Sequence, residues 1–208
     1  MIIFIRYISK KIIGYLRNIG VIVYEIPKQF KNIEIKKVRW KMFIDFLQDN
    51  KNKYNLVLYT DITDTIFQGD VFDYYKDYEP FFGVSLEDIS IRSWINKKRI
   101  MDYIGKKKYR RIRNERIIYV DLLLGTIDKF LEFSITFWNK LQESFKAVEQ
   151  GIFCYLIYYK KILKEYILKF DNFGPIIVLR LFKNKNFDLD SDVNILNNRG
   201  EIAALMSQ

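Results

Sequence analysis

The sequence predicts an α/β fold in which strands and helices alternate along the chain. Short apolar runs lie at residues 2–5 and 21–26, a third ends at Asp61, and helical patterns at 9–18 and 38–48 separate them. A strand–helix–strand order favours parallel pairing, because parallel strands need a crossover connection. Uninterrupted apolar strands also indicate a sheet that is covered on both faces. We therefore expect a mixed, mostly parallel sheet flanked by helices.

Turn-forming residues mark the ends of the first elements. Gly20 is suited to end the first helix, and Pro27 stops the second strand. The second helix has apolar residues at the spacing of one helix face: Trp40, Phe43, Ile44 and Leu47. The first 64 residues therefore read β-α-β-α-β.

The rest of the chain continues with both kinds of element. Residues 72–82 are aromatic and irregular, and we expect no regular element there. Phe130, Phe133, Phe137, Leu141 and Phe145 give a strong helical stripe. The other expected elements are an extended piece at 86–91, a helix at 94–103 ended by Gly105, a strand at 117–124, a helix at 149–163, a strand at 176–182, a turn-like tail at 188–200 and an edge strand at 202–206.

Length and composition bound the class of protein. The chain has 208 residues, of which half are hydrophobic, so we expect one domain over residues 1–208 with a full core. The absence of histidine excludes His-based catalysis and His-ligated zinc, so any metal needs oxygen ligands. The single cysteine, Cys154, lies in an apolar run and is expected to be a buried small hydrophobe.

No apolar run is long enough to be a transmembrane helix, and the first residues lack the order of a signal peptide. We therefore expect a cytoplasmic protein. A basic amphipathic helix that includes Ile12, Ile13 and Leu16 leaves peripheral association with a membrane surface open.

The formal net charge of +10 permits anionic partners. The densest cluster of cations comprises Lys106, Lys107, Lys108, Arg110, Arg111 and Arg113. A solvated loop or helix face explains this cluster better than a recognition site. Tyr109 is the only aromatic residue inside it, which does not favour nucleic acid, because single-strand binders carry repeated stacking residues.

The candidate site is acidic and lies in residues 54–72, YNLVLYTDITDTIFQGDVF. Asp61 and Asp64 follow an apolar run that reads as a buried strand. In open α/β sheets, ligands bind outside the carboxyl ends of the strands, so these acids are candidates for a metal or a polar ligand. The alternative is that Asp61 caps a turn and Asp64 is solvated.

Several segments in the same order resemble a family of GT-A-type glycosyltransferases. Residues 54–72 resemble the family's strand end, Asp-Val-Arg-Asp-x-x-Phe-Gln-x-x-Pro-Phe. Further similarity lies at Arg39-Trp40, Trp94-Ile95, residues 114–118, Leu124-Gly125-Thr126, the Glu149-Gln150 helix start and residues 195–208. The resemblance covers about residues 20–208.

The resemblance implies transfer of a sugar from a nucleotide-sugar to an acceptor that the sequence does not identify, whether glycan or protein. Asp61 and Asp64 would hold a divalent ion, Mn²⁺ or Mg²⁺, and bind the donor. Gln68, Gly125 and Thr126 would also contact the donor. Glu149 would contact the sugar or the acceptor as a catalytic residue, with Gln150 supporting it.

The chain departs from the family at several of these positions. Asp121 stands where the family has a small residue, Glu149 replaces an Asp, and Ser207 replaces a metal-ligand His. The ends fit a domain shortened at both termini. Two alternatives therefore stay open: a non-catalytic relative, and a protein that binds nucleic acid or an anionic surface through residues 106–113.

Overall fold

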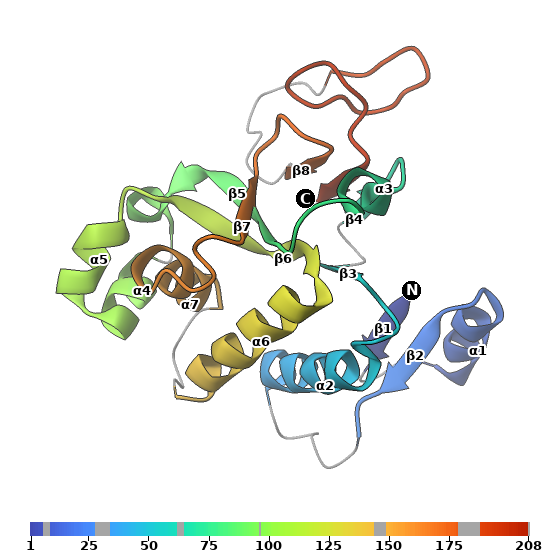
Figure 1. Ribbon diagram of the computed structural model, residues 1–208, viewed down its shortest axis with the longest axis horizontal. Coiled ribbons are helices and arrows are strands. Elements are labelled where there is room, and N and C mark those ends of the chain that lie inside the picture. Colours follow the sequence, from blue (N-terminus) through green and yellow to red (C-terminus); the bar gives the residue numbers. More distant parts are fainter. Residues whose placement is uncertain are drawn as a thin grey trace. The chain divides into compact units, whose positions relative to one another are not determined.

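The computed structural model describes residues 1–5, 9–27, 34–61, 65–95, 97–143, 149–178 and 188–207 (Figure 1). The chain divides into two compact units, Met1–Asp49 and Asn50–Gln208. The first unit carries a two-stranded sheet, and the second carries a four-stranded and a three-stranded sheet.

The first unit begins with the predicted strand–helix–strand. Strands β1 (Ile2–Ile5) and β2 (Ile22–Glu25) pair in parallel, and α1 (Lys10–Asn18) joins them. Ser9 caps α1, since its hydroxyl accepts a hydrogen bond from the backbone N–H of Ile12 at 3.4 Å. Gly20 follows the helix with φ of +83°, a conformation that favours glycine. The parallel pairing predicted for these two strands is confirmed.

Helix α2 (Ile35–Asn50) is longer than the predicted 38–48. Its predicted apolar face is buried: Trp40, Phe43, Ile44 and Leu47. The rings of Trp40 and Phe43 meet edge to face at 5.9 Å, and Phe46 makes the same kind of contact with Tyr24 of β2 at 5.7 Å. Aromatic packing therefore ties this helix to the small sheet.

The second unit is organised around a four-stranded sheet in the order β3-β6-β5-β7. Its strands are β3 (Leu56–Thr60), β5 (Phe82–Ser90), β6 (Arg116–Thr126) and β7 (Ile167–Phe170). β6 pairs antiparallel with both β3 and β5, and only β7 adds a parallel pair, with β5. The sheet is mixed but mostly antiparallel, so the prediction of a mostly parallel sheet is wrong.

The prediction failed because an apolar run indicates that a strand is buried and does not indicate the direction of its neighbours. β6 is apolar almost throughout because both of its faces are buried, and burial on two faces does not depend on the direction of the neighbouring strands. The strand–helix–strand order predicted the pairing of β1 with β2 correctly. It does not extend to β3, whose partner β6 lies far along the chain.

One face of the sheet packs against helices. α6 (Ile127–Gln142) buries the predicted stripe of Phe130, Phe133, Phe137 and Leu141, while Phe145 lies outside the described residues. Phe82 of β5 stacks on Phe133 at 4.4 Å, and Phe153 of α7 (Glu149–Cys154) approaches Phe133 to 4.8 Å. A continuous aromatic layer therefore joins β5, α6 and α7.

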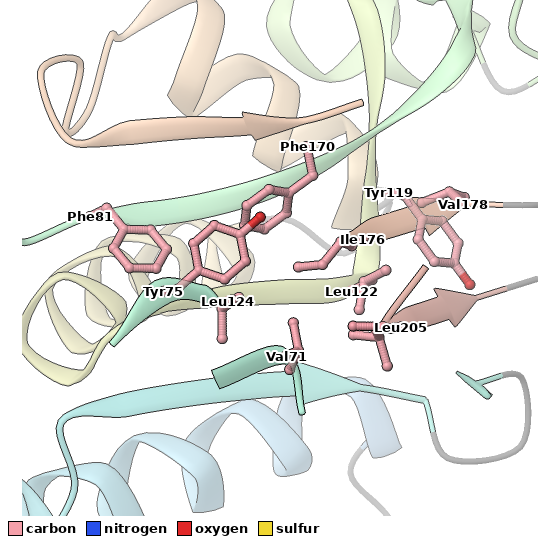
Figure 2. Packing of buried hydrophobic residues seen from close by; sticks show 11 residues of the cluster. Val71, Tyr75, Phe81, Tyr119, Leu122, Leu124, Phe170, Ile176, Val178 and Leu205 are labelled. Atoms are coloured by element: carbon pink, nitrogen blue, oxygen red, sulfur yellow. The ribbon is translucent and has the colours of Figure 1, made fainter. Parts of the chain in front are cut away.

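The other face packs against α3 (Val71–Tyr75) and a three-stranded sheet of β4 (Thr65–Phe67), β9 (Leu205–Ser207) and β8 (Ile176–Val178), in that order. Phe81 lies in this second layer, which fits the alternation of side chains next to Phe82. Figure 2 shows the cluster: Val71, Tyr75, Phe81, Tyr119, Leu122, Leu124, Phe170, Ile176, Val178, Ala204 and Leu205. The final strand was predicted at the edge of a sheet, which is wrong, because β9 lies between β4 and β8.

The remaining elements differ from those that local sequence patterns predict. The predicted helix at 149–163 is interrupted: α7 passes into a π-helical segment, η3 (Tyr155–Tyr159), and Lys161 and Leu163 then take positive φ values of 57° and 53°. In the segment predicted to be irregular, Asp70 starts α3 by accepting the N–H of Phe72 at 2.9 Å. The short strand β7 was not predicted.

The last helices are α4 (Lys97–Ile104), preceded by a single 3₁₀ turn, η2 (Ile91–Ser93), and α5 (Lys106–Ile112). The basic cluster therefore forms a solvated helix, one of the two structures expected for it. Across the described ranges, no helix combines the length and the apolar character that crossing a bilayer requires.

The close approach of β5 and β6 requires Gly125. A Cβ at this position would meet the carbonyl oxygen of Phe81 at 2.7 Å and the Cα of Phe82 at 3.2 Å, and neither backbone atom can move without disturbing the sheet. We expect Gly125→Ala to lower the free energy of unfolding by about 1–3 kcal/mol, measured by urea titration. Gly174→Ala is the matched control, since a Cβ there meets nothing within 4 Å. Equal losses for both variants would contradict this account.

Burial also sets the chemistry of Cys154. Its side chain is fully buried, and this desolvation raises the pKa of the thiol from 9.0 to about 12. The unfolded chain releases this proton at a lower pH than the folded chain, so the free energy of unfolding should fall as pH rises from 9 towards 12. The slope from this group is at most about 1.4 kcal/mol per pH unit.

The measurement is urea unfolding at several alkaline pH values, for the wild type and for Cys154→Ala. Burial raises the pKa of Tyr75 as well, so part of the slope remains in both proteins. A slope that is unchanged in Cys154→Ala would refute the assignment to the thiol.

Candidate acidic site at the end of strand β3

Asp61 follows β3 directly and is half-buried. Its backbone N–H donates to the carbonyl oxygen of Asp121 on β6 at 3.2 Å. Its own carbonyl oxygen accepts a hydrogen bond from the Thr65 hydroxyl at 2.6 Å, and that hydroxyl also lies 2.5 Å from the hydroxyl of Thr60. The ends of the short segment 62–64 are thus held together, while Asp64 itself lies outside the described residues.

Ser207 lies beside Thr65, the residue whose hydroxyl bonds to the carbonyl oxygen of Asp61. It pairs with Thr65 across the β4–β9 ladder and with Val178 on the other side. Its side chain is fully buried, and its hydroxyl donates to the phenol oxygen of Tyr119 at 3.2 Å. The structure therefore places Ser207, the position at which the resemblance implies a metal ligand, opposite Thr65, whose hydroxyl bonds to the carbonyl oxygen of Asp61. A buried serine hydroxyl that is already bonded to a tyrosine is a poor ligand for a divalent ion.

Asp121 is a neighbour that sequence reasoning did not count among the site residues. It is half-buried within β6, at the level of Asp61. The β5–β6 register shifts at this level, between Val84 and Ser85, and the Ser85 hydroxyl donates to the carbonyl of Leu122 at 2.9 Å. The available signal was a single acid inside the apolar run RIIYVDLLL.

Glu149 and Gln150 begin α7, and both are buried. The amide nitrogen of Gln150 donates to a carboxylate oxygen of Glu87 on β5 at 2.7 Å. Glu87 is itself buried, and no sequence signal singled it out. A charge-assisted bond of this kind fixes the orientation of the Gln150 amide. Leu86, the residue before Glu87, stands opposite Ile118, three residues of β6 before Asp121, which is about 10 Å at the rise of a strand.

Gln68 has a structural task. Its amide nitrogen donates to the carbonyls of Ile195 at 3.0 Å and Ala203 at 2.7 Å, and its oxygen accepts the N–H of Ile195 at 2.8 Å. Both donors of the side chain are therefore used to hold the loop that leads into β9. Contact of Gln68 with a sugar donor stays a prediction.

Gly125 and Thr126 lie at the other end of the β3–β6 pair. Gly125 stands opposite Val57, and Thr126 opposite Leu56, whereas Asp61 lies beyond the carboxyl end of β3. The strand rise puts about 13 Å between these levels. The hydroxyl of Thr126 donates to the carbonyl of Phe81 at 3.3 Å, so both residues have structural explanations. The structure does not bring them to Asp61, and their contact with a donor stays a prediction.

The described residues do not by themselves form a metal site. Among them, no group of three acidic or sulfur ligands gathers at one place. Asp61 offers one carboxylate just beyond the end of β3, and the second predicted ligand, Asp64, is not described. A pocket lies between α3 and the β7–β8 connection, and its lining, which includes Tyr75, Tyr78 and Asp171, contains none of the predicted site residues.

Gln68→Glu tests whether this side chain holds the C-terminal loop. The substitution preserves shape but replaces both donors with an acceptor facing two carbonyl oxygens, so we expect a loss of about 1–3 kcal/mol in the free energy of unfolding. Hydrogen exchange at residues 195–207 should accelerate more than exchange in β6. Unchanged exchange in this loop would show that the three hydrogen bonds do not hold it.

Comparison with known proteins identifies the fold. The sequence matches no family model and no curated protein. Solved structures match this fold, and two of them show the similarity over almost the whole chain. One is a glycosyltransferase involved in glycosylation of the major capsid of PBCV-1, with a TM-score of 0.50, 10% identity and coverage of 100% of this chain and 91% of that one. The other is an active-site glutamine-to-glutamate mutant of LgtC, with a TM-score of 0.55, 13% identity and coverage of 99% and 75%. The chain therefore has the GT-A glycosyltransferase fold.

Proposed function

We propose that this chain binds a nucleotide-sugar at the carboxyl end of β3 and transfers the sugar to an acceptor. The observation that carries the proposal is the position of Asp61 in a glycosyltransferase fold: half-buried, at the end of a sheet strand, and braced by Asp121 and Thr65.

In this proposal Asp61 and Asp64 face the diphosphate of the donor. They would hold Mn²⁺ or Mg²⁺, which when bound supplies positive charge that stabilises the departing nucleoside diphosphate. The hydrogen bond from the Thr65 hydroxyl holds the backbone of Asp61, and the β4–β9 ladder holds Thr65.

The sugar end of the donor is assigned to Glu149 and Gln150. The bond to Glu87 engages the Gln150 amide through its nitrogen, so the carbonyl oxygen is the acceptor of that side chain. This oxygen is suited to accept a hydrogen bond from a sugar hydroxyl. Glu149 would act on the sugar or the acceptor. A glycan on a protein is the acceptor class to test first, since one structural neighbour acts in capsid glycosylation.

A second candidate is donor binding without transfer. Two observations favour it: the Ser207 hydroxyl is buried and bonded to Tyr119, and the described residues lack a cluster of three metal ligands. Both candidates predict stabilisation by a nucleotide-sugar, and only the first predicts release of a nucleoside diphosphate.

The decisive measurement is thermal unfolding with a panel of UDP- and GDP-sugars in the presence of Mn²⁺ or Mg²⁺. A donor at a hundred times its dissociation constant stabilises the folded state by about 2.7 kcal/mol, which raises Tm by about 5–10 °C for a chain of this size. We expect Asp61→Ala to abolish this shift, because it removes the carboxylate at the diphosphate. Asp102→Ala is the control, since it removes an exposed carboxylate on α4.

Turnover separates the two candidates. Wild-type protein should release nucleoside diphosphate when acceptor is added, and Gln150→Ala should keep most of the thermal shift while losing at least about tenfold in rate. Absence of a thermal shift with every donor and metal would refute both candidates. A shift without release of diphosphate would support binding alone.

A further inference from the structure

Residues 91–113 carry a concentration of positive charge that the proposed transferase site does not use. The segment contains ten Lys and Arg residues and one acid, Asp102. All ten cations are exposed: Arg92, Lys97, Lys98, Arg99, Lys106, Lys107, Lys108, Arg110, Arg111 and Arg113. We call this segment the basic hairpin. Figure 1 shows its helices, α4 and α5, lying together with α7.

None of these ten cations is paired with an acid in the described part of the chain, although six ion pairs form elsewhere in it. Two of them lie over aromatic rings instead: the Lys108 ammonium is 5.6 Å from the centre of the Tyr155 ring, and the Arg111 guanidinium is 5.9 Å from that of Tyr159. Lys160 adds a further cation 6.0 Å from the Tyr155 ring. Cation–π contacts position positive charge without neutralising it.

The hairpin is a fixed structure. Gly105, with φ of +84°, makes the turn between α4 and α5. The two ends of the hairpin are joined, because the N–H of Arg92 donates to the carbonyl of Arg113 at 2.9 Å. α4 packs closely on α7, since a Cβ at Gly151 would come within 3.0 Å of the Ile100 side chain.

An exposed aliphatic side chain lies near the joined ends. Ile95 is 90% exposed, more than any other large hydrophobic residue of the described chain, and it directly follows the buried Trp94. It lies three residues from Arg92 and two from Lys97. An exposed apolar side chain flanked along the sequence by cations suits the boundary between lipid headgroups and acyl chains.

The same features argue against nucleic acid as the partner. Binding of single strands uses exposed rings on which bases stack. Here Tyr155 is 7% exposed, and Tyr159 stacks on it at 5.4 Å under Arg111, so these rings are already covered. Tyr109 is half-buried. A cationic surface without free rings, bordered by an exposed aliphatic residue, fits a lipid surface better.

We propose that the basic hairpin docks the protein on an anionic membrane surface, with the cations on the phosphate and carboxylate headgroups and Ile95 in the interfacial layer. This docking is independent of sugar transfer. It places no residue of the hairpin in the catalytic machinery, so the membrane experiment and the donor experiment fail separately.

Vesicle co-sedimentation tests the proposal. We expect the full chain to bind phosphatidylcholine vesicles that contain about 30% phosphatidylserine and not pure phosphatidylcholine vesicles. Raising NaCl from about 50 mM to about 300 mM should weaken binding at least tenfold, because salt screens the headgroup charge. Lys107→Glu with Arg110→Glu should weaken it about thirtyfold or more, since each cation near the surface contributes about fivefold.

The matched control reverses two exposed lysines of α1, Lys10→Glu with Lys11→Glu, and so makes the same change in net charge. We expect this control to weaken binding less than threefold. Ile95→Ser should weaken vesicle binding about fivefold without altering the dependence on salt. The neutral pair Lys107→Gln and Arg110→Gln checks that the loss comes from missing positive charge rather than from damage to the fold.

Three results would overturn the proposal. The first is equal binding to vesicles with and without phosphatidylserine. The second is an equal loss in the α1 control, which would assign binding to net charge or to α1. The third is tight, salt-dependent binding to an RNA or DNA oligonucleotide together with no binding to vesicles.

Discussion

The second unit depends on the burial of β6 on both faces. This 11-residue strand pairs with β3 on one side and β5 on the other, while helices cover one face and the three-stranded sheet covers the other. A carboxylate in such a strand is costly unless it is hydrated or partnered. Asp121 is the one acid in β6. Its carbonyl oxygen accepts the N–H of Asp61, the residue that directly follows β3. The break in the apolar character of the strand therefore coincides with the candidate site.

Amide side chains organise the region that the apolar core does not reach. Gln68 spans the connection between β4 and residues 195–203, and Asn172 bonds both backbone groups of Val178. Asn197 donates to the carbonyls of Phe173 and Gly174 and accepts the N–H groups of Arg199 and Glu201. These bonds substitute for the strand ladders that the short chain segments there do not form. They are specific in geometry, so they determine register as well as stability.

Sequence reasoning succeeded where the determinant was local. The period of the α6 phenylalanines and Gly20 as a helix end depend on residues within a few positions of one another. It failed where the determinant was a distant partner. The apolar content of β6 does not encode whether β3 runs parallel or antiparallel to it, and nothing near Gln68 indicates that its amide bonds to Ile195 and Ala203.

The candidate site divides in the same way. A run of apolar residues followed by an acid was enough to place Asp61 at a strand end. The resemblance assigned Gly125 and Thr126 to the same site as Asp61, because it rests on the order of segments along the chain and not on distances in space. The antiparallel register separates them, because β6 reaches these residues after it has passed Asp61. Glu87 was missed since a glutamate in the SLEDIS strand looks like any solvent-facing acid.

The central position of β9 also affects the order in which the protein assembles. Residues 205–207 enter between β4 and β8, so the three-stranded sheet has no continuous ladder until this segment arrives. The pairing of Thr65 with Ser207 closes a loop of well over a hundred residues, a contact of high sequence separation and therefore slow to form. During synthesis on the ribosome, β3 and β6 can pair long before β9 is available to pair with β4. The acidic site is thus expected to mature late, after the core that supports it.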